Sequence, residues 1–500
     1  MDDLTHSEYS KFLKDFEDTL RHLFHEKEDI NKLSLERGLP PAVMSEIMSK
    51  VPLSVAIPKQ YGGRGSIVKE CLGVLSAASY ESLSLSLTFG INIALFLEPV
   101  SKYANESIRQ EIFNRFLKNQ NMGGLMITEP DYGSDALNMK TFNKEVEDGY
   151  KIKGTKHWQG LTGLANYWII ASRKELDNGE LARDIDFFIS DESVPKQKIV
   201  VEELYDNAGL YMIPYGLNKL DIEVPKSHKL EPETTGIKMM LDILHRSRLQ
   251  FPGMGMGFIK RMLDEAISQC KNRMVGTSNL LAIDQVQYQL SRIQSAFTIC
   301  SAMCAHSSNM SGIEHNLASE GIEANSMKAV VTDLMQESAQ LLVQLSGAQG
   351  YRTTHIGGRG IMDSRPFQIF EGSNEMLYSQ IADMITRAMK KQKQLHLFDF
   401  LKDFKLTSEA CLHFKKDLSF TLNSVLSQRK LVDLGKILSR IVCIGYVLEL
   451  KAKGFRADLV DNCITSVQQE VSALFSSFHF DSVTTVVEDY SENSLWLKFV

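Results

Sequence analysis

The spacing of apolar residues changes twice along the chain, and each change predicts a different kind of structure. Up to about residue 120 the apolar positions recur every three or four residues, as in EYSKFLKDFEDTLRHLF, which predicts amphipathic helices. The segment SIVKECLGVLSAASYESLSLSLTFGINIALFL is apolar on most sides and predicts a long, mostly buried helical stretch. Between these parts, Ala56 to Gly65 predicts a loop, because AIPKQYGGRG concentrates proline and three glycines.

From about Met122 to about Leu230 the apolar positions alternate with polar ones, which predicts a β unit. The clearest alternating segments are TFNKEVEDGYKIKGTKHW, NYWIIASRK, DIDFFIS and NKLDIEVP. Asp148-Gly149 lies between two alternating runs and predicts a tight hairpin, because a type I′ turn needs positive φ at both central residues.

Helical spacing returns after the β unit, and four amphipathic stretches predict a helix bundle. These stretches are FIKRMLDEAISQCKNRM, DQVQYQLSRIQSAFTICSAMCAHSSNM, GIEANSMKAVVTDLMQESAQLLVQLSG and GSNEMLYSQIADMITRAMKKQ. The last hundred or so residues predict further helices and a short mixed tail. We therefore expect a helical domain at 1–120, a β domain at 121–232, a helix bundle at 233–392 and a helical extension at 393–500.

Length, composition and charge limit the classes of protein to which the chain can belong. The chain has 500 residues, of which 43% are hydrophobic, enough to fill several packed parts. Its formal net charge of -7 comes without long runs of one sign, which disfavours nucleic acid as a partner. The N-terminus has neither a signal nor a transit pattern, and the longest smooth apolar run found, Ile441 to Leu450, is far below the roughly 20 residues that span a bilayer. These features predict a soluble, cytoplasmic protein.

The seven cysteines are scattered, which favours reduced thiols over a disulfide framework. Cys300, Cys304 and His306 form a possible cluster of metal ligands, but they are only three and no second pair completes a tetrahedral site. Buried helix packing is the favoured interpretation, and we expect no metal. The chain also has no glycine-rich turn between a strand and a helix, so a nucleotide cofactor would have to be held without a Rossmann fingerprint or a P-loop.

Four stretches resemble those of a known family, both in their order and in their separations along the chain. They are AIPKQYGGRG, LMITEPDYGSD (125–135), VQLSGAQGY (343–351) and QIFEGSNE (368–375). Together they resemble the signature stretches of the acyl-CoA dehydrogenases over roughly residues 40 to 390. The resemblance implies an α+β fold with an N-terminal helical domain, a middle β-barrel or sandwich and a C-terminal four-helix bundle. It also implies FAD, and removal of hydrogen from the α and β carbons of an acyl-CoA thioester to give the 2-enoyl-CoA.

The resemblance places the catalytic base at Glu371, which would remove the α proton while flavin N5 accepts the β hydride. Phe367, Ile369 and Phe370 predict an apolar surround that raises the pKa of this carboxyl. Gly372 lets a substrate approach the backbone, and in the family the amide of the base residue donates to the thioester carbonyl. The alternative is that Glu371 merely caps or precedes the helix that starts near Ser373.

A second position tests this assignment, because some relatives carry the base just before an arginine in the bundle. The corresponding pair here is Ser247-Arg248, and serine cannot serve as that base. Glu371 is then the only base that the family pattern leaves. The resemblance assigns substrate contacts to His245, Arg248, Gly372 and Ser134; the alternative for Arg248 is a solvated cation at a helix start.

The resemblance assigns flavin contacts in the β unit to Leu125, Met126, Ile127, Thr128 and Ser134. Locally, EPDYGSD also has the composition of an ordinary turn.

Trp158 resembles the tryptophan that packs by the flavin rings, although tryptophans at a β surface usually fill a core. Many members have a threonine two residues further on, where this chain has Gly160, so a backbone contact could survive but the side-chain contact could not.

The remaining cofactor contacts implied by the resemblance reach a neighbouring subunit or follow the base. Arg273 is available for the FAD pyrophosphate, in a region where the family pattern is poorly kept. The other assigned contacts are Gln285, Gln344, Gly347, Ser373 and Glu375. Active sites built across an interface imply a homodimer or a homotetramer, and an electron-transfer flavoprotein is the expected electron acceptor.

Three alternatives stay open at this point. The same chemistry could act on an acyl group carried by a carrier protein, the chain could be a catalytically silent flavin-binding relative, or it could be an oxidase. The extension could form an interfacial helix around LSRIVCIGYVLELKAKGFR and contact a membrane peripherally, but packing on the body of the protein is favoured.

Overall fold

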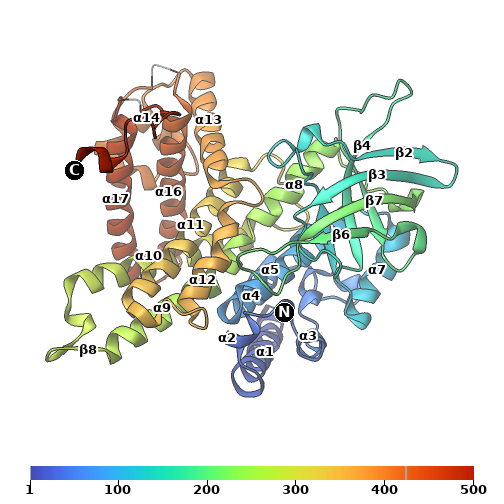
Figure 1. Cartoon of the computed structure of the whole chain (residues 1–500), viewed down its shortest axis with the longest axis horizontal. Coiled ribbons are helices and arrows are strands. Elements are labelled where there is room, and N and C mark those ends of the chain that lie inside the picture. Colours follow the sequence, from blue (N-terminus) through green and yellow to red (C-terminus); the bar gives the residue numbers. More distant parts are fainter. Residues whose placement is uncertain (1, 423–424, 483) are drawn as a thin grey trace.

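The computed structural model describes residues 2–422, 425–482 and 484–500 (Figure 1). N-terminal helices lie below a curled sheet, and a bundle of long helices stands beside both. The helices α16 (Gln428–Ala452) and α17 (Ala457–His479) of the extension lie on the side of the bundle away from the sheet (Figure 1). This arrangement confirms the predicted α+β fold class.

The N-terminal part is helical, as predicted. Its helices are α1 (Asp2–Arg21), α2 (Ile30–Leu33), α3 (Pro41–Ser49), α4 (Val68–Glu81), α5 (Leu83–Asn92), α6 (Glu98–Tyr103) and α7 (Glu106–Asn119). The predicted long helical stretch is interrupted at Ser82, which has an extended backbone (φ -149°) and accepts the N–H of Leu85 with its hydroxyl. Serine here ends one helix and caps the next, which the apolar pattern alone does not reveal.

The segment from Leu83 to Tyr103 is long and apolar enough to cross a membrane by length and composition, but 94% of its most apolar window is buried inside the protein. It is longer than the run from Ile441 to Leu450, so the statement that the latter is the longest apolar run was wrong. A π-helical turn (Ile93–Leu97) joins α5 to α6 and disturbs the helical spacing there. The segment is a core helix of the fold.

All four alternating segments form strands of one curled sheet. The strands are β1 (Gly123–Met126), β2 (Phe142–Val146), β3 (Gly149–His157), β4 (Tyr167–Lys174), β5 (Asp186–Asp191), β6 (Val200–Leu204) and β7 (Gly216–Pro225). Their order is β1-β4-β2-β3-β7-β6, and β5 also pairs with β4. β4 is parallel to β1 and β2, and the other pairs are antiparallel.

The hairpin between β2 and β3 exists, but its turn differs from the prediction. Val146 pairs with Gly149, so the turn consists of Glu147 and Asp148, and neither has a positive φ. Gly149 is already part of β3. A Cβ there would collide with the carbonyl oxygen of Val224 in β7, so this glycine allows two strands to approach closely and does not form the turn.

The bundle contains the four predicted helices and two more. Its helices are α8 (Gly236–Arg248), α9 (Phe251–Asn272), α10 (Asp284–Met310), α11 (Gly321–Ser346), α12 (Ile356–Ser364) and α13 (Asn374–Gln392). A small hairpin, β8 (Met274–Val275) and β9 (Ser278–Asn279), joins α9 to α10. Cys300 is buried and its thiol donates to the carbonyl of Pro252, a packing role as favoured above.

The extension packs on the bundle. Its helices are α14 (Leu397–Asp403), α15 (Lys415–Leu418), α16 (Gln428–Ala452) and α17 (Ala457–His479). α16 lies against α10, α11 and α13, and its apolar side is buried there, including Leu434, Ile437, Leu438 and Ile441. The segment considered for a membrane surface therefore packs on the body of the protein.

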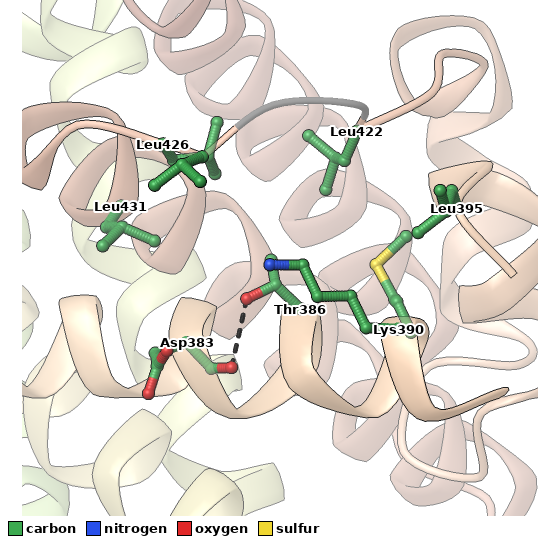
Figure 2. Close-up of a pocket in the computed structure, with 9 residues that line it drawn as sticks. Asp383, Thr386, Lys390, Leu395, Leu422, Leu426 and Leu431 are labelled. Carbon is green, nitrogen blue, oxygen red and sulfur yellow. Dashed lines mark hydrogen bonds between the residues drawn. The ribbon is translucent and has the colours of Figure 1, made fainter. Parts of the chain in front are cut away.

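A small pocket lies between α13 and two segments of the extension, at Leu395 and at 422–431 (Figure 2). Asp383, Thr386 and Lys390 of α13 face Leu422 and Leu431 across it. Its volume is about 100 Å³. Sites for cofactors and drug-sized ligands usually enclose roughly 300–1,000 Å³, so this pocket does not fit a flavin or an acyl-CoA.

His306 joins the bundle to the extension. Its Nε2 lies 3.1 Å from Glu323 Oε1 of α11, and its Nδ1 lies 2.9 Å from Glu449 Oε2 of α16. The ring also packs on Tyr446, with 4.1 Å between the ring centroids. Burial lowers the pKa of His306, but the two carboxylates outweigh it and hold the pKa above its ordinary value of 6.5.

We predict that replacing His306 with glutamine lowers the melting temperature mainly at low pH. A raised pKa in the folded state stabilises the protein fully below the unfolded pKa, and this contribution is lost as the pH rises through the folded pKa. Thermal unfolding between pH 6 and 9 measures the difference between parent and variant. The exposed His413 provides the control variant His413→Gln, and an equal, pH-independent loss for His306→Gln would contradict the ion-pair account.

Candidate active site

The segment around Glu371 has an unusual backbone. A 3-10 turn (Arg365–Gln368) leads into Glu371 at φ 51° and Gly372 at φ 91°, and α13 then begins with Ser373 as its N-cap. The hydroxyl of Ser373, not the carboxylate of Glu371, accepts the N–H of Met376. The interpretation of Glu371 as a helix cap is therefore wrong. A glutamate in the left-handed region costs roughly 1–2 kcal/mol, which surrounding interactions must offset.

Two buried cations hold this backbone. Arg248 at the end of α8 donates through Nη2 to the carbonyl oxygen of Glu371 at 2.8 Å, and Lys328 of α11 donates through Nζ to the carbonyl oxygen of Gly372 at 2.8 Å. Arg248 also donates to Asn325 Oδ1 at 2.7 Å, which fixes the orientation of its guanidinium. The two successive left-handed residues thus have their carbonyl groups held from two different helices.

The carboxylate of Glu371 is only half satisfied. Ser247 donates its hydroxyl to Oε1 at 2.9 Å, whereas Oε2 is buried and has no hydrogen-bond partner among the described residues. Nor does the N–H of Glu371 reach an acceptor within the described part of the chain. Native proteins rarely leave buried polar groups unpaired, so an acceptor and a donor on one residue point to a ligand that would use them.

Burial is the main cause of the altered pKa of Glu371. It raises the pKa of the carboxyl, and the favourable effects of Arg248, Ser247 and Lys328 lower it again without cancelling the shift. Lys328 is itself buried, and burial lowers the pKa of its ammonium group to about 7. The site therefore holds a weakly acidic carboxyl beside a weakly basic amine.

The predicted apolar surround is only partly present. Phe367 is fully buried and packs on Phe370 and Phe251, with ring centroids 4.9 Å and 5.9 Å apart. Ile369 is 57% exposed, so the expectation that it surrounds the base was wrong. The 3-10 turn places Phe367 and Ile369 on different sides of the segment, and only the former faces the core.

Arg248 and His245 are both buried in α8, and neither is a solvated cation. The guanidinium of Arg248 donates to Glu371 and Asn325, so it lies beside the predicted base. His245 has its Nδ1 2.7 Å from the carbonyl oxygen of Leu317, and burial lowers its pKa to about 4, which keeps the ring neutral. Contact of His245 or Arg248 with a substrate stays a prediction.

The predicted flavin contacts at 125–128 lie at the end of β1. A buried ion pair holds them in place. Lys156 of β3 is fully buried and its Nζ lies 2.9 Å from Glu129 Oε1 and 2.8 Å from the carbonyl oxygen of Ile127. Glu129 also accepts the backbone N–H groups of Lys140 and Thr141. Burial lowers the pKa of Lys156 to about 8. This pair fixes the 125–129 segment against β3.

Trp158 lies beside that segment, because the N–H of His157 donates to the carbonyl oxygen of Thr128. Trp158 has φ 59° and is 51% exposed, and its ring stands 4.6 Å from that of Tyr205. It is therefore not a core-filling residue. An aromatic face presented at a β surface is suited to stacking on a flat ring.

Close packing explains why residue 160 is a glycine. A Cβ at this position would lie 2.7 Å from Cδ1 of Ile91, which comes from α5. The space that a threonine side chain would need is therefore occupied in this chain. Ser134 lies exposed in the loop after β1, and its flavin and substrate contacts stay predictions.

A third group of predicted residues lies elsewhere on the bundle. Arg273 ends α9 and Gly347 ends α11, and a Cβ on Gly347 would lie 3.3 Å from Nη1 of Arg273. Gln344 and Gln285 are exposed at the end of α11 and the start of α10. Lys328 contacts Gly372 in the segment 368–374 around the predicted base, called the base segment below. Lys328 is separated from Ser346 by about 27 Å along α11 at about 1.5 Å per residue.

The predicted site residues therefore fall into three groups. Glu371, Gly372 and Ser373 lie together with Ser247 and Arg248, and the exposed Glu375 follows in the first turn of α13. The residues at 125–128 lie with Trp158 at the sheet. Arg273 lies beside Gly347 at the end of α11 that is about 27 Å from Lys328, so this group does not contact the segment around Glu371.

Sequence reasoning missed Lys328 and the pair of Lys156 and Glu129. A signal for each existed. Lys328 interrupts an apolar run of α11, SMKAVV, and Lys156 has the same strand parity as the inward-facing Ile152. A lysine at an inward position indicates a buried cation that needs an oxygen partner.

Comparison with known proteins supports the same interpretation. Three family models match the chain: acyl-CoA dehydrogenase N-terminal domain at 12–120, middle domain at 124–221 and C-terminal domain at 234–386. The chain is similar to an acyl-CoA dehydrogenase of Bacillus subtilis, with 23% identity over 330 residues, covering 65% of this chain and 84% of the relative.

Solved structures show a similar fold. Butyryl-CoA dehydrogenase from Megasphaera elsdenii matches with a TM-score of 0.66 and 19% identity, covering 75% of this chain and 98% of that one. An acyl-CoA dehydrogenase complexed with FAD from Bacillus anthracis matches with a TM-score of 0.77 and 17% identity, covering 94% of this chain and 88% of that one. The larger coverage shows that most of the extension also has a counterpart there.

We predict that Gly372→Ala destabilises the protein more than Gly454→Ala. Both glycines have nearly the same φ, 91° and 92°, so each substitution carries a similar backbone cost of about 1–2 kcal/mol. Only at Gly372 would the new Cβ meet other atoms, 2.8 Å from Met376 Cε and 3.1 Å from Leu377 Cδ2, which adds about 1–3 kcal/mol. Urea unfolding measures both variants, and equal losses would show that the base segment is not tightly packed.

Proposed function

We propose a function from one premise: the chain belongs to the acyl-CoA dehydrogenase family, since models of all three family domains match it in order. The proposed reaction is α,β-dehydrogenation of a saturated acyl-CoA thioester to the 2-enoyl-CoA. In it Glu371 removes the proton from the α carbon. FAD, when bound, supplies the acceptor for the β hydride.

The observation that carries this proposal is that Oε2 and the N–H of Glu371 both have no partner within the described ranges of the chain. A general base needs a free oxygen that can take the proton, and its raised pKa brings it nearer the working pH. Loss of the α proton moves negative charge onto the thioester oxygen, which the Glu371 N–H is free to stabilise. Ser247 holds the other oxygen, which fixes the orientation of the carboxylate.

The residues present fit a flavin in the sheet domain. The half-exposed face of Trp158 and the backbone of 125–128 would hold its ring system, and Lys156 with Glu129 would keep that backbone in place. The exposed Arg273 offers a guanidinium for the FAD pyrophosphate. It lies beside Gly347, at the end of α11 that is about 27 Å from Lys328, which favours a cofactor bound across an interface, so we propose a homodimer or homotetramer.

Several finer points stay proposals. An electron-transfer flavoprotein is the proposed acceptor of the electrons, and the cytoplasmic location stays a prediction. A thioester on a carrier protein would use the same base, and no contact in the structure favours it over CoA. The unpaired, strained Glu371 argues against a silent relative, because a chain without catalysis gains nothing from the strain.

We predict that Glu371→Gln abolishes substrate reduction of the flavin while leaving FAD bound. The purified protein is expected to be yellow and to bleach when a saturated straight-chain acyl-CoA is added without oxygen. Removing the base should slow bleaching about 100- to 10,000-fold. Asp383→Asn, on the same α13, is the control and should bleach normally.

Two results would contradict this proposal. Bleaching of Glu371→Gln at the parental rate would mean that another group removes the proton. A colourless parent protein that cannot be reconstituted with FAD would remove the flavoprotein assignment altogether.

We also predict that Ser247→Ala shifts the rate profile to higher pH. The base acts when ionised, so the rate rises as the pH passes the pKa of Glu371, and loss of the Ser247 hydrogen bond raises that pKa further. A hydrogen bond to a charged group contributes about 1.5–3 kcal/mol, so a shift of about one to two pH units is expected. Ser326→Ala is the control, because its buried hydroxyl has no partner among the described residues. An unchanged profile for Ser247→Ala would show that this contact does not tune the base.

A further inference from the structure

Asp333 of α11 holds the base segment from both sides. Its Oδ1 accepts the side-chain N–H of Gln368 at 2.8 Å and that of Asn374 at 2.7 Å. These two residues stand three positions before and three positions after Glu371. Asn374 in turn accepts a hydrogen bond from Lys328 at 3.0 Å, and Lys328 holds the carbonyl of Gly372. One carboxylate therefore fixes both ends of the strained segment.

The other oxygen of Asp333 is contacted both by α13 and by the extension. Tyr378 of α13 donates its hydroxyl to Oδ2 at 2.6 Å, and Arg440 of α16 approaches the same oxygen with Nη2 at 3.4 Å. Arg440 also donates through Nη1 to the Tyr378 hydroxyl at 2.6 Å, and through Nε to Glu470 of α17 at 2.9 Å. Its side chain is only 7% exposed, so this guanidinium is buried at the boundary of bundle and extension.

The positive charge of Arg440 also acts on Asp333, so its role goes beyond packing. Asp333 is linked to two basic side chains, directly to Arg440 on the extension side and through Asn374 to Lys328 on the other side. Removal of Arg440 takes the ion-pair partner away from this carboxylate, and Lys328 is then the remaining buried basic side chain next to the network. Lys328 would then be drawn toward Asp333 and away from the carbonyl of Gly372. The clamp on the base segment would loosen.

We infer that Arg440 is a positioning residue for Glu371, through which the C-terminal extension holds the catalytic base in place. The contacts run from Arg440 to Asp333, from Asp333 to Gln368 and Asn374, and from Asn374 through Lys328 to Gly372. The extension is then a working part of the site. The expected effect of Arg440 on catalysis rests on the proposed function. Its expected effect on the position of the base segment does not.

Arg292 of α10 provides a matched control. It pairs with Glu337 of α11 at 2.9 and 3.0 Å and lies 3.5 Å from Glu470, so it also joins bundle and extension and shares a partner with Arg440. It makes no contact with Asp333, Gln368 or Asn374. Arg292→Met therefore weakens the docking of α17 without touching the base segment.

The experiment compares Arg440→Met with Arg292→Met in the full-length protein. Amide hydrogen exchange of peptides covering 366–377 should be about tenfold faster in Arg440→Met and unchanged in Arg292→Met. Anaerobic reduction of the flavin by an acyl-CoA should be about 10- to 100-fold slower in Arg440→Met, at unchanged FAD content and substrate affinity. The isotope effect of an α-deuterated substrate should also increase.

Two further variants keep the test decisive. Tyr378→Phe removes a single hydroxyl from the network and should show the same changes to a smaller degree, even if Arg440→Met folds poorly. Arg440→Lys restores the charge and should recover part of the rate and most of the exchange protection.

The possible outcomes separate the two proposals. Normal exchange at 366–377 in both Arg440→Met and Tyr378→Phe would overturn the inference. Equal changes in Arg440→Met and Arg292→Met would do the same, because docking alone would explain them. If the parent protein reduces no flavin with any acyl-CoA, the proposed function fails, and the exchange measurement still decides whether Arg440 holds the segment.

Discussion

The site depends on two buried cations that hold the carbonyl groups of Glu371 and Gly372. These residues adopt left-handed backbone conformations, and the glutamate alone costs roughly 1–2 kcal/mol. A hydrogen bond from a charged donor contributes about 1.5–3 kcal/mol, so the bond from Arg248 offsets this strain, and the bond from Lys328, whose pKa burial lowers to about 7, adds to this stabilisation. Without them the carboxylate would lose the position in which Oε2 is buried and unpaired, and the proposed base could not act.

This constraint explains why the surrounding helices must pack as they do. Arg248 comes from the end of α8 and Lys328 from α11, while the segment itself leads into α13. Cations buried without partners would be costly, and each is placed where oxygen acceptors meet it. Through Asp333 and Arg440 the same network reaches α16, which links the extension to the position of the base.

Much of the fold could be predicted from the sequence, because periodicity reports which face of an element is buried. The stretch predicted at 284–310 coincides with α10, and the alternating segments all became strands. Local errors arose where one residue has a role outside the pattern: Ser82 caps a helix, Gly149 admits a neighbouring strand and Ile369 faces outward. The proposed base was found from the family resemblance. Its partner Lys328 was not found in this way. The sequence shows a lysine at an inward position of α11, but it does not show which distant carbonyl group that lysine binds.

The most direct test of this account is uptake of solvent deuterium at the α carbon of an acyl-CoA incubated with the protein in D₂O. Removal and return of the α proton is the step assigned to Glu371, and mass spectrometry measures it apart from the overall turnover. The account predicts exchange with the parent protein and a loss of about 100-fold or more in Glu371→Gln. Exchange at the same rate in both proteins would contradict it, because a group other than Glu371 would then be removing the proton.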